Sequence, residues 1–287
     1  MKTALDPLCS ARLLLLTLLI LLGTTWPGPF ESVAAEPGQL PRLLIAGDST
    51  AANGVPDAIG WGRMFGDYFD PSKVTVLNRA RGGRSSRTFV TEGLWEELLA
   101  EVQPGDIVLI QFGHNDGGAV NGDKPWLVRG SLPGIGEETE DIINGVTGEA
   151  ETVYTFGHYI RKMVTDVRDR QAQPILLSLT VRNIWEEGRV ERGSGEYREW
   201  TRQLAEELEV PFVDLTGIIA DCYEDLGQEM VGAFFPKDHT HTSETGARLN
   251  AELVVSGLQG LRDQSIIGLL SAAGRLVATA DPDQVWV

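Results

Sequence analysis

Short apolar runs alternate along this chain with longer stretches whose apolar residues recur every three or four positions. The longer stretches are typical of amphipathic helices and cover residues 93–102, 156–171 and 194–210. The runs have the length of buried strands: PRLLIAG (41–47), KVTVLN (73–78), DIVLIQFG (106–113), PILLSLT (174–180) and PFVDLT (211–216). This order predicts an α/β fold, a five-stranded parallel sheet with helices on both faces, and a ligand site at the carboxyl ends of its strands.

The N-terminus has the composition of a Sec-type signal peptide. An apolar block, residues 13–22, follows Lys2 and Arg12 and precedes the small residues 33–35. Because a membrane span needs roughly 20 apolar residues, this block is too short to cross a bilayer. We therefore expect cleavage near Ala35, a secreted or periplasmic protein of residues 36–287, and no membrane association after cleavage. A retained N-terminal anchor is the alternative.

The charge and cysteine content narrow the possible partners and sources of stability. The formal net charge is −17, and Lys2 and Arg12 balance Asp6 and Glu31, so removal of residues 1–35 leaves this excess unchanged. This negative charge repels the phosphate backbone, which argues against nucleic acid as a partner. Cys222 is the only cysteine after Cys9, so the mature chain would have no internal disulfide and would depend on packing.

One interval interrupts the alternation of strands and helices. Residues 117–152 are rich in glycine, acids and turn formers, have no clear periodicity and directly follow a predicted strand. Loops of this length inside a compact domain are usually functional or disordered. We expect this insert to form a wall of the site, within one domain whose core covers residues 43–258.

Three polar motifs follow predicted strands, and a fourth precedes a helix that we expect near the end of the chain. They are GDST (47–50), NRARGGRSS (78–86), GHND (113–116) and DHTH (238–241). Together they supply the parts of an acyl-transfer site. Ser49 is the candidate nucleophile, His241 the base and Asp238 the carboxylate that orients it. The backbone N–H groups of Ser49 and Gly83 and the side-chain amide of Asn115 are candidate oxyanion donors.

In order and spacing, these motifs resemble the four signature blocks of the SGNH (GDSL-type) hydrolases. The longer strings FGHNDGG (112–118) and DHTHTSETGA (238–247) resemble the rhamnogalacturonan acetylesterases within that group. The resemblance implies a flavodoxin-like three-layer sandwich and a Ser49–His241–Asp238 triad. It also implies oxyanion donors at Ser49, Gly83 and Asn115, and no metal or other cofactor.

Each motif also has a simpler interpretation when taken alone. Ser49 could be a helix N-cap, Gly83 a tight turn, and residues 238–241 a solvated loop. His239 and His241 form a His-x-His pair, but no third ligand is spaced to complete a metal site. The Gly-x-Ser-x-Gly motif of the α/β-hydrolases is absent around Ser49. The joint occurrence of four motifs at successive strand ends favours the hydrolase.

Four arginines surround the candidate oxyanion glycine of this acidic chain: Arg79, Arg81, Arg84 and Arg87. A guanidinium pairs well with a carboxylate, so Arg81 and Arg84 are candidates for binding the uronates of an acidic polysaccharide. Alternatively, these arginines pair with the protein's own acidic residues.

The sequence therefore predicts a secreted serine esterase that removes O-acetyl groups from acetylated pectic polysaccharide or oligosaccharide through an acetyl-serine intermediate. Acetylated xylan and lipase-like esters remain alternative substrates. A non-catalytic glycan-binding protein of the same fold is the alternative of another class.

Overall fold

The computed structural model describes residues 40–286, and the predicted signal peptide lies outside them. The central sheet has the strand order β10-β9-β6-β3-β1-β2. Its strands are β1 (Arg42–Gly47), β2 (Thr75–Asn78), β3 (Ile107–Gln111), β6 (Gln173–Leu177), β9 (Phe212–Val213) and β10 (Val285–Trp286). The first five in chain order are parallel and correspond to the five predicted runs, whereas β10 pairs antiparallel with β9 at the edge.

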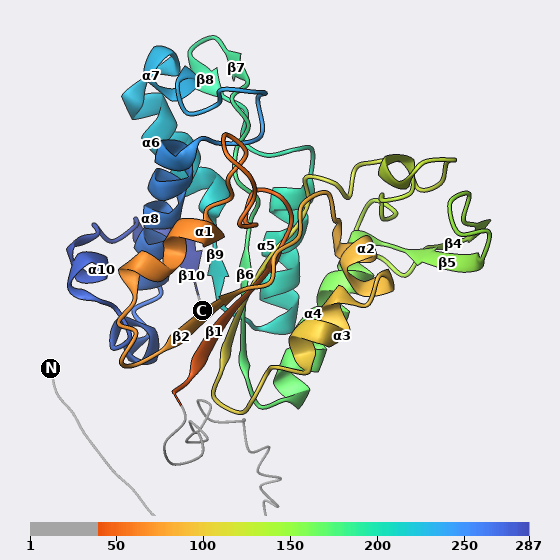
Figure 1. The fold of residues 1–287 in the computed structure, drawn as a ribbon, viewed down its shortest axis with the longest axis horizontal. Coiled ribbons are helices and arrows are strands. Elements are labelled where there is room, and N and C mark those ends of the chain that lie inside the picture. Colours follow the sequence, from red (N-terminus) through yellow and green to blue (C-terminus); the bar gives the residue numbers. More distant parts are fainter. Residues whose placement is uncertain (1–39, 287) are drawn as a thin grey trace, which may run out of the picture. The chain divides into compact units, whose positions relative to one another are not determined.

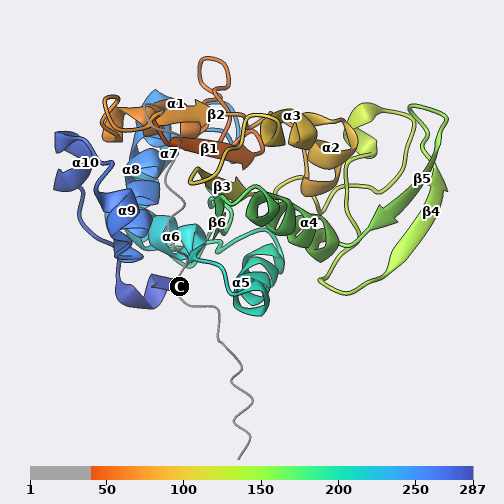
Figure 2. The same ribbon diagram turned by 90° about the horizontal axis from the view of Figure 1, so that it is seen from below.

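Helices cover both faces of this sheet (Figures 1 and 2). One layer contains α1 (Gly62–Phe65), α6 (Leu215–Leu226) and α8 (Glu244–Gly260), and the other contains α2 (Ser86–Thr91), α3 (Leu94–Leu99), α4 (Phe156–Asp169) and α5 (Tyr197–Leu208). The residues of β1 alternate between the two layers: Leu43 and Ile45 belong to the α1/α6/α8 core, whereas Leu44 and Ala46 belong to the α3/α4/α5 core. This confirms the predicted three-layer α/β architecture.

The remaining elements are short. They are α7 (Gln228–Gly232), α9 (Gln264–Ile267), α10 (Ala272–Leu276), the 3-10 turns at Gly66–Tyr68, Pro125–Leu127 and Pro282–Gln284, and the two-stranded pairs β4 (Thr139–Ile143) with β5 (Ala150–Tyr154) and β7 (Trp185–Glu186) with β8 (Arg189–Val190). Within residues 40–286, no helix combines the length and apolar character needed to cross a membrane.

The strand order places the predicted site at the switch point of the sheet. From β1 the chain crosses to β2 on one side, and then returns past β1 to β3 on the other. The loops after β1 and β3 therefore diverge from adjacent carboxyl ends, where open α/β sheets bind ligands. Ser49 follows β1 and Asn115 follows β3, so the topology brings these two motifs to the same edge.

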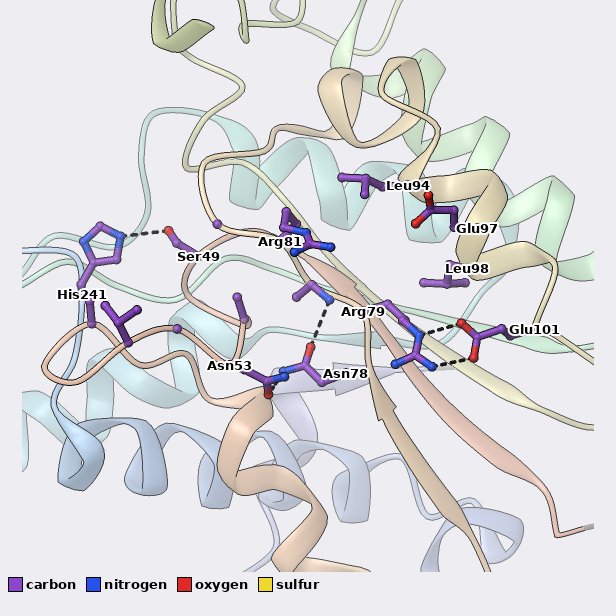
Figure 3. Close-up of a pocket in the computed structure, with 16 residues that line it drawn as sticks. Ser49, Asn53, Asn78, Arg79, Arg81, Leu94, Glu97, Leu98, Glu101 and His241 are labelled. Atoms are coloured by element: carbon purple, nitrogen blue, oxygen red, sulfur yellow. Dashed lines mark hydrogen bonds and ion pairs between the residues drawn. The ribbon is translucent and has the colours of Figure 1, made fainter.

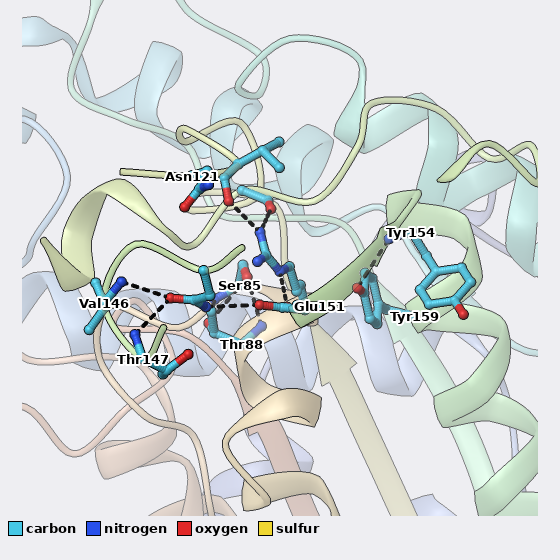
Figure 4. Close-up of polar contacts among 12 residues, drawn as sticks. Ser85, Thr88, Asn121, Val146, Thr147, Glu151, Tyr154 and Tyr159 are labelled. Atoms are coloured by element: carbon cyan, nitrogen blue, oxygen red, sulfur yellow. Dashed lines mark hydrogen bonds and ion pairs between the residues drawn. The ribbon is translucent and has the colours of Figure 1, made fainter. Parts of the chain in front are cut away.

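The interval from 117 to 152 is more ordered than its sequence suggested, because it contains β4 and most of the β4–β5 hairpin. Asn144 closes the hairpin turn, since its side-chain oxygen accepts hydrogen bonds from the backbone N–H groups of Val146 and Thr147 (Figure 4). Arg87 of α2 anchors the interval. Its guanidinium, 1% exposed, pairs with Glu151 and donates to the carbonyls of Val120 and Gly130.

Candidate active site

Ser49, His241 and Asp238 form a continuous chain of hydrogen bonds. Ser49 Oγ lies 3.0 Å from His241 Nε2, although the two residues are 192 positions apart. His241 Nδ1 lies 2.8 Å from Asp238 Oδ2. Asp238 is therefore placed to hold the imidazole in the tautomer whose Nε2 accepts the serine proton. The structure thus brings together the three residues that the sequence singled out as nucleophile, base and orienting carboxylate.

A buried network fixes the turn that presents Ser49. The carboxylate of Asp48 is fully buried and accepts hydrogen bonds from the backbone N–H and the hydroxyl of Thr50, each at 2.8 Å. Gln111 at the end of β3 donates to the Thr50 hydroxyl and accepts from the Trp61 indole. These hydrogen bonds join the loop after β1 to the end of β3 and to Trp61, and they hold Ser49 at the end of β1.

The loop that carries His241 is attached to the segment that follows Ser49. Ile59 and Thr242 exchange hydrogen bonds: the Ile59 N–H donates to the Thr242 carbonyl at 2.9 Å, and the Thr242 hydroxyl donates to the Ile59 carbonyl at 2.7 Å. Immediately afterwards, Ser243 caps the N-terminus of α8. These contacts between segments far apart in sequence explain how the imidazole is held against the hydroxyl.

The carboxylate of Asp238 stays ionised over the ordinary pH range. Burial alone would raise its pKa, but hydrogen bonds from the His241 ring and from the backbone N–H groups of His241 and Thr240 outweigh this effect and lower the pKa to about 2. An ionised Asp238 stabilises the imidazolium that forms when His241 takes a proton.

The candidate oxyanion donors lie around Ser49. A Cβ atom built on Gly82 would lie 3.6 Å from the Cβ of Ser49, so the segment leading to Gly83 packs against the serine. Asn115 Nδ2 donates to the carbonyl of Arg84 at 2.9 Å, which ties Asn115 to the other side of Gly83. Gly83 has a φ of +79°, a conformation that only glycine adopts readily. Among the hydrogen bonds within residues 40–286, none uses the backbone N–H of Ser49 or Gly83 as donor.

A cavity of about 640 Å³ opens beside Ser49 and His241 (Figure 3). Its walls come from the loop after β1, the segment 78–82 after β2, and α3. No lining residue comes from 117–152, so the predicted insert is not a wall of this cavity. The insert instead contacts the residues that follow β3: the Ser131 hydroxyl donates to Asp116, and the Gly118 N–H donates to the Asn115 carbonyl. No motif in the sequence indicated that α3 would line the site.

The four arginines of residues 79–87 differ in their surroundings. Arg79 forms two hydrogen bonds to Glu101, Arg84 pairs with Glu92, and Arg87 pairs with Glu151. These three follow the alternative prediction of pairing with the protein's own acids. Arg81 lines the cavity and is exposed, and no carboxylate within residues 40–286 lies at ion-pair distance from it.

Two buried groups beside Asn115 should make stability depend on pH with opposite signs. Burial lowers the pKa of His114 to about 4, so between this value and 6.5 the unfolded chain binds the extra proton and stability rises with pH. Burial raises the pKa of Asp116 to about 6, although hydrogen bonds from Ser86 offset part of this increase. Between 3.8 and this value the folded chain holds the extra proton, and stability falls as pH rises.

Replacing each group singly should therefore separate the two effects. In Asp116→Asn, the free energy of unfolding should rise more steeply between pH 4 and 6 than in the parent, by up to about 1.4 kcal/mol per pH unit. In His114→Gln the slope should become flatter or negative. Urea unfolding at a series of pH values measures both slopes, and identical slopes in the two variants would contradict these assignments.

Comparison with known proteins agrees with this architecture. A family model described as the GDSL-like lipase/acylhydrolase family matches residues 45–249. A rhamnogalacturonan acetylesterase of Emericella nidulans is 37% identical over 224 residues, covering 77% of this chain and 86% of that protein. The Bacillus subtilis rhamnogalacturonan acetylesterase RhgT is 32% identical over 238 residues, covering 77% and 90%.

Solved structures share the fold. The Bacillus subtilis protein YxiM superposes with a TM-score of 0.63 at 24% identity and covers 80% of this chain, which in turn spans 59% of YxiM. The acetylxylan esterase Axe2 of Geobacillus stearothermophilus superposes with a TM-score of 0.50 at 17% identity, covering 76% and 94%. The predicted fold and the predicted enzyme class are both confirmed: this chain is a carboxylic ester hydrolase and belongs to the GDSL-like lipase/acylhydrolase family.

Proposed function

We propose that Ser49, His241 and Asp238 act as the catalytic triad of a carbohydrate O-acetylesterase. The observation that carries this proposal is the hydrogen-bond chain from Ser49 Oγ through the two ring nitrogens of His241 to the Asp238 carboxylate. Its distances match those expected between a nucleophile, a general base and the group that orients the base.

The reaction follows from this geometry in two halves. Ser49 Oγ attacks the carbonyl carbon of the acetyl ester while His241 Nε2 takes the hydroxyl proton. His241 then returns this proton to the sugar oxygen as the ester bond breaks, which leaves acetyl-Ser49. A water molecule next attacks the acetyl carbonyl carbon while His241 Nε2 accepts one of its protons. His241 returns this proton to Ser49 Oγ as the acyl bond breaks, and acetic acid leaves and ionises to acetate. Asp238 remains ionised throughout.

The oxyanion that forms in both halves would be bound by the backbone N–H groups of Ser49 and Gly83 and by the amide of Asn115. Asn115 can serve because one amide hydrogen is enough to hold the Arg84 carbonyl, which leaves the other for the substrate. Donors that are already fixed in place need no reorganisation when charge develops on the oxygen.

Replacing Asn115 by alanine should therefore lower kcat by about 10²–10³-fold on p-nitrophenyl acetate, the loss typical of one missing oxyanion donor. KM should change much less, because the interaction strengthens in the transition state. Steady-state kinetics at a fixed pH measure both constants. A kcat within about threefold of the parent would remove Asn115 from the oxyanion site.

We assign the substrate to acetylated pectic polysaccharide or its oligosaccharides. Two relatives at 37% and 32% identity, each similar over most of its length, are named rhamnogalacturonan acetylesterases. Acetate release from acetylated rhamnogalacturonan, homogalacturonan and xylan would test this assignment. The highest kcat/KM is expected on a pectic polymer. A higher value on acetylated xylan would favour the xylan alternative, and a preference for long-chain acyl esters would favour a lipase.

We further propose that the protein is exported and loses residues 1–35. The support is the sequence alone, in which a short apolar block lies between basic and small residues. Mass spectrometry of the protein recovered from its source organism should find Glu36 as the first residue in the culture medium or periplasm. A cell-associated protein that retains Met1 would contradict the proposal.

A further inference from the structure

The cavity beside Ser49 extends well beyond the space that an acetyl group needs. It begins at Ser49 and His241, passes along Ala80, Arg81 and Gly82, and ends at α3 and the turn after it, where Leu94, Glu97, Leu98 and Glu101 line it. Figure 3 shows this direction, with Ser49 and His241 on one side, the α3 residues on the other, and Arg81 between them. Its volume of about 640 Å³ lies within the range of small-molecule sites. The cavity can therefore hold a sugar residue next to the acetylated one.

Two guanidinium groups line this cavity, and only one of them is free to bind a ligand anion. Arg79 is held by Glu101 through two hydrogen bonds of 2.7 and 2.6 Å, which neutralises its charge. Arg81 has no carboxylate partner among the residues that the structure describes, and its side chain is exposed to the cavity. Glu97 lies at the α3 end and disfavours a second anion there. The position for an anion is therefore beside Arg81, on the Ser49 side of α3.

The backbone around Arg81 is fixed relative to the nucleophile. The Arg81 N–H donates to the carbonyl of Gly47 at 2.9 Å, two residues before Ser49. Asn78 ties the same segment to the loop after β1, because its amide donates to the Ala51 carbonyl at 2.8 Å and its oxygen accepts from the Ala80 N–H at 3.1 Å. A cation on such a fixed segment can align a substrate by charge without ordering a mobile loop first.

We infer that Arg81 binds the carboxylate of a uronic acid residue that adjoins the acetylated sugar on the α3 side of Ser49. This inference rests on the proposed function and deepens it, because it assigns the recognition of an acidic glycan to one residue. A guanidinium can bind a carboxylate through two parallel hydrogen bonds. It would also offset locally the repulsion that a protein of net charge −17 exerts on an anionic polymer. Arg84, the other predicted candidate, already pairs with Glu92 and does not line the cavity.

The test compares Arg81→Gln with Arg84→Gln, which remove the same charge three residues apart. Each variant is assayed on acetylated oligogalacturonides, acetylated xylo-oligosaccharides and p-nitrophenyl acetate. Arg81→Gln should lower kcat/KM on the oligogalacturonides about tenfold, mainly through KM, and change the values on the two neutral substrates by less than about twofold. Arg84→Gln should leave the ratio of acidic to neutral kcat/KM close to that of the parent.

Equal losses on all three substrates in Arg81→Gln would overturn the inference, because a residue that merely shapes the site does not distinguish acidic from neutral sugars. Equal effects of the two variants would also overturn it and would indicate a general effect of net charge.

A binding measurement separates this inference from the proposed function. Calorimetry should give Ser49→Ala/Arg81→Gln a Kd for acetylated oligogalacturonide about tenfold above that of Ser49→Ala. Unchanged affinity would overturn the role of Arg81 even if the parent releases acetate. Arg81-dependent binding without acetate release from any substrate would retain the uronate site and reject the esterase assignment.

Discussion

Replacing Ser49 by alanine should lower kcat/KM for p-nitrophenyl acetate by at least about 10³-fold, the largest effect on activity that the structure predicts. The reason is that no other hydroxyl is hydrogen-bonded to His241 Nε2 within residues 40–286. Loss of a nucleophile removes the covalent route entirely and leaves only substrate binding and oxyanion stabilisation. Steady-state hydrolysis assays over a wide range of enzyme concentration measure the residual rate.

Two further measurements make this result specific. The far-ultraviolet circular dichroism of Ser49→Ala should match that of the parent, because the Ser49 side chain is not part of the Asp48–Thr50–Gln111 network that holds the turn. His241→Ala should lose activity to a similar degree, since the two residues act as one unit. Near-parental turnover by a folded Ser49→Ala protein would place the nucleophile elsewhere.

Arg87→Met should have the largest effect on stability, lowering the free energy of unfolding by about 3–5 kcal/mol. The side chain of Arg87 is 1% exposed and that of Glu151 is 18% exposed, so the substitution strands a carboxylate that water reaches poorly. The carbonyls of Val120 and Gly130 also lose their donor. For a protein of this size the corresponding fall in Tm is roughly 6–20 °C.

Arg202→Met is the matched control for this prediction. Arg202 lies on α5 and pairs with Glu199 and Glu206 of the same helix, but its side chain is 37% exposed. Ion pairs of this kind contribute about 0–1 kcal/mol, so thermal unfolding should barely change. A similar fall in Tm for both variants would show that the buried Arg87–Glu151 pair contributes no more to stability than an exposed ion pair.

The main features of the fold could be predicted because they are encoded locally. Each parallel strand is a short apolar run, and most of the intervening helices carry one apolar face. The candidate site could be predicted for the same reason, since each polar motif directly follows a strand or precedes α8. Parallel topology then brings those motifs to one edge without further information.

Elements that depend on distant contacts gave no such signal. Strand β10 is two residues long, and Trp286 within it pairs with Phe212 of β9. The rings of these two residues also pack together, with 4.5 Å between their centroids. The β4–β5 hairpin lies in an acidic, glycine-rich segment that exposes most of its residues. Its position depends on Arg87, 64 residues before Glu151 in the sequence. Which residues form ion pairs across such separations in sequence depends on the folded topology.

The same limit applies to the arginines near Gly83. Their spacing indicates a local concentration of positive charge, but only the positions of Glu92, Glu101 and Glu151 reveal which guanidinium groups are neutralised. The sequence selected Arg81 and Arg84 together as substrate-binding candidates. The structure distinguishes them because Glu92, just after α2, pairs with Arg84, and Glu101, just after α3, pairs with Arg79, whereas Arg81 faces the cavity.

The proposed catalysis depends on one arrangement, in which the Ser49 hydroxyl reacts because the His241 imidazole, 192 positions later in the chain, activates it. Labelling with a serine-reactive fluorophosphonate, followed by peptide mapping, tests this most directly. One equivalent of label should be found on the peptide that contains Ser49, in proportion to the activity lost, and labelling should be strongly slowed in His241→Ala. Complete inactivation with the label on another residue, or full activity after Ser49 is modified, would contradict the account.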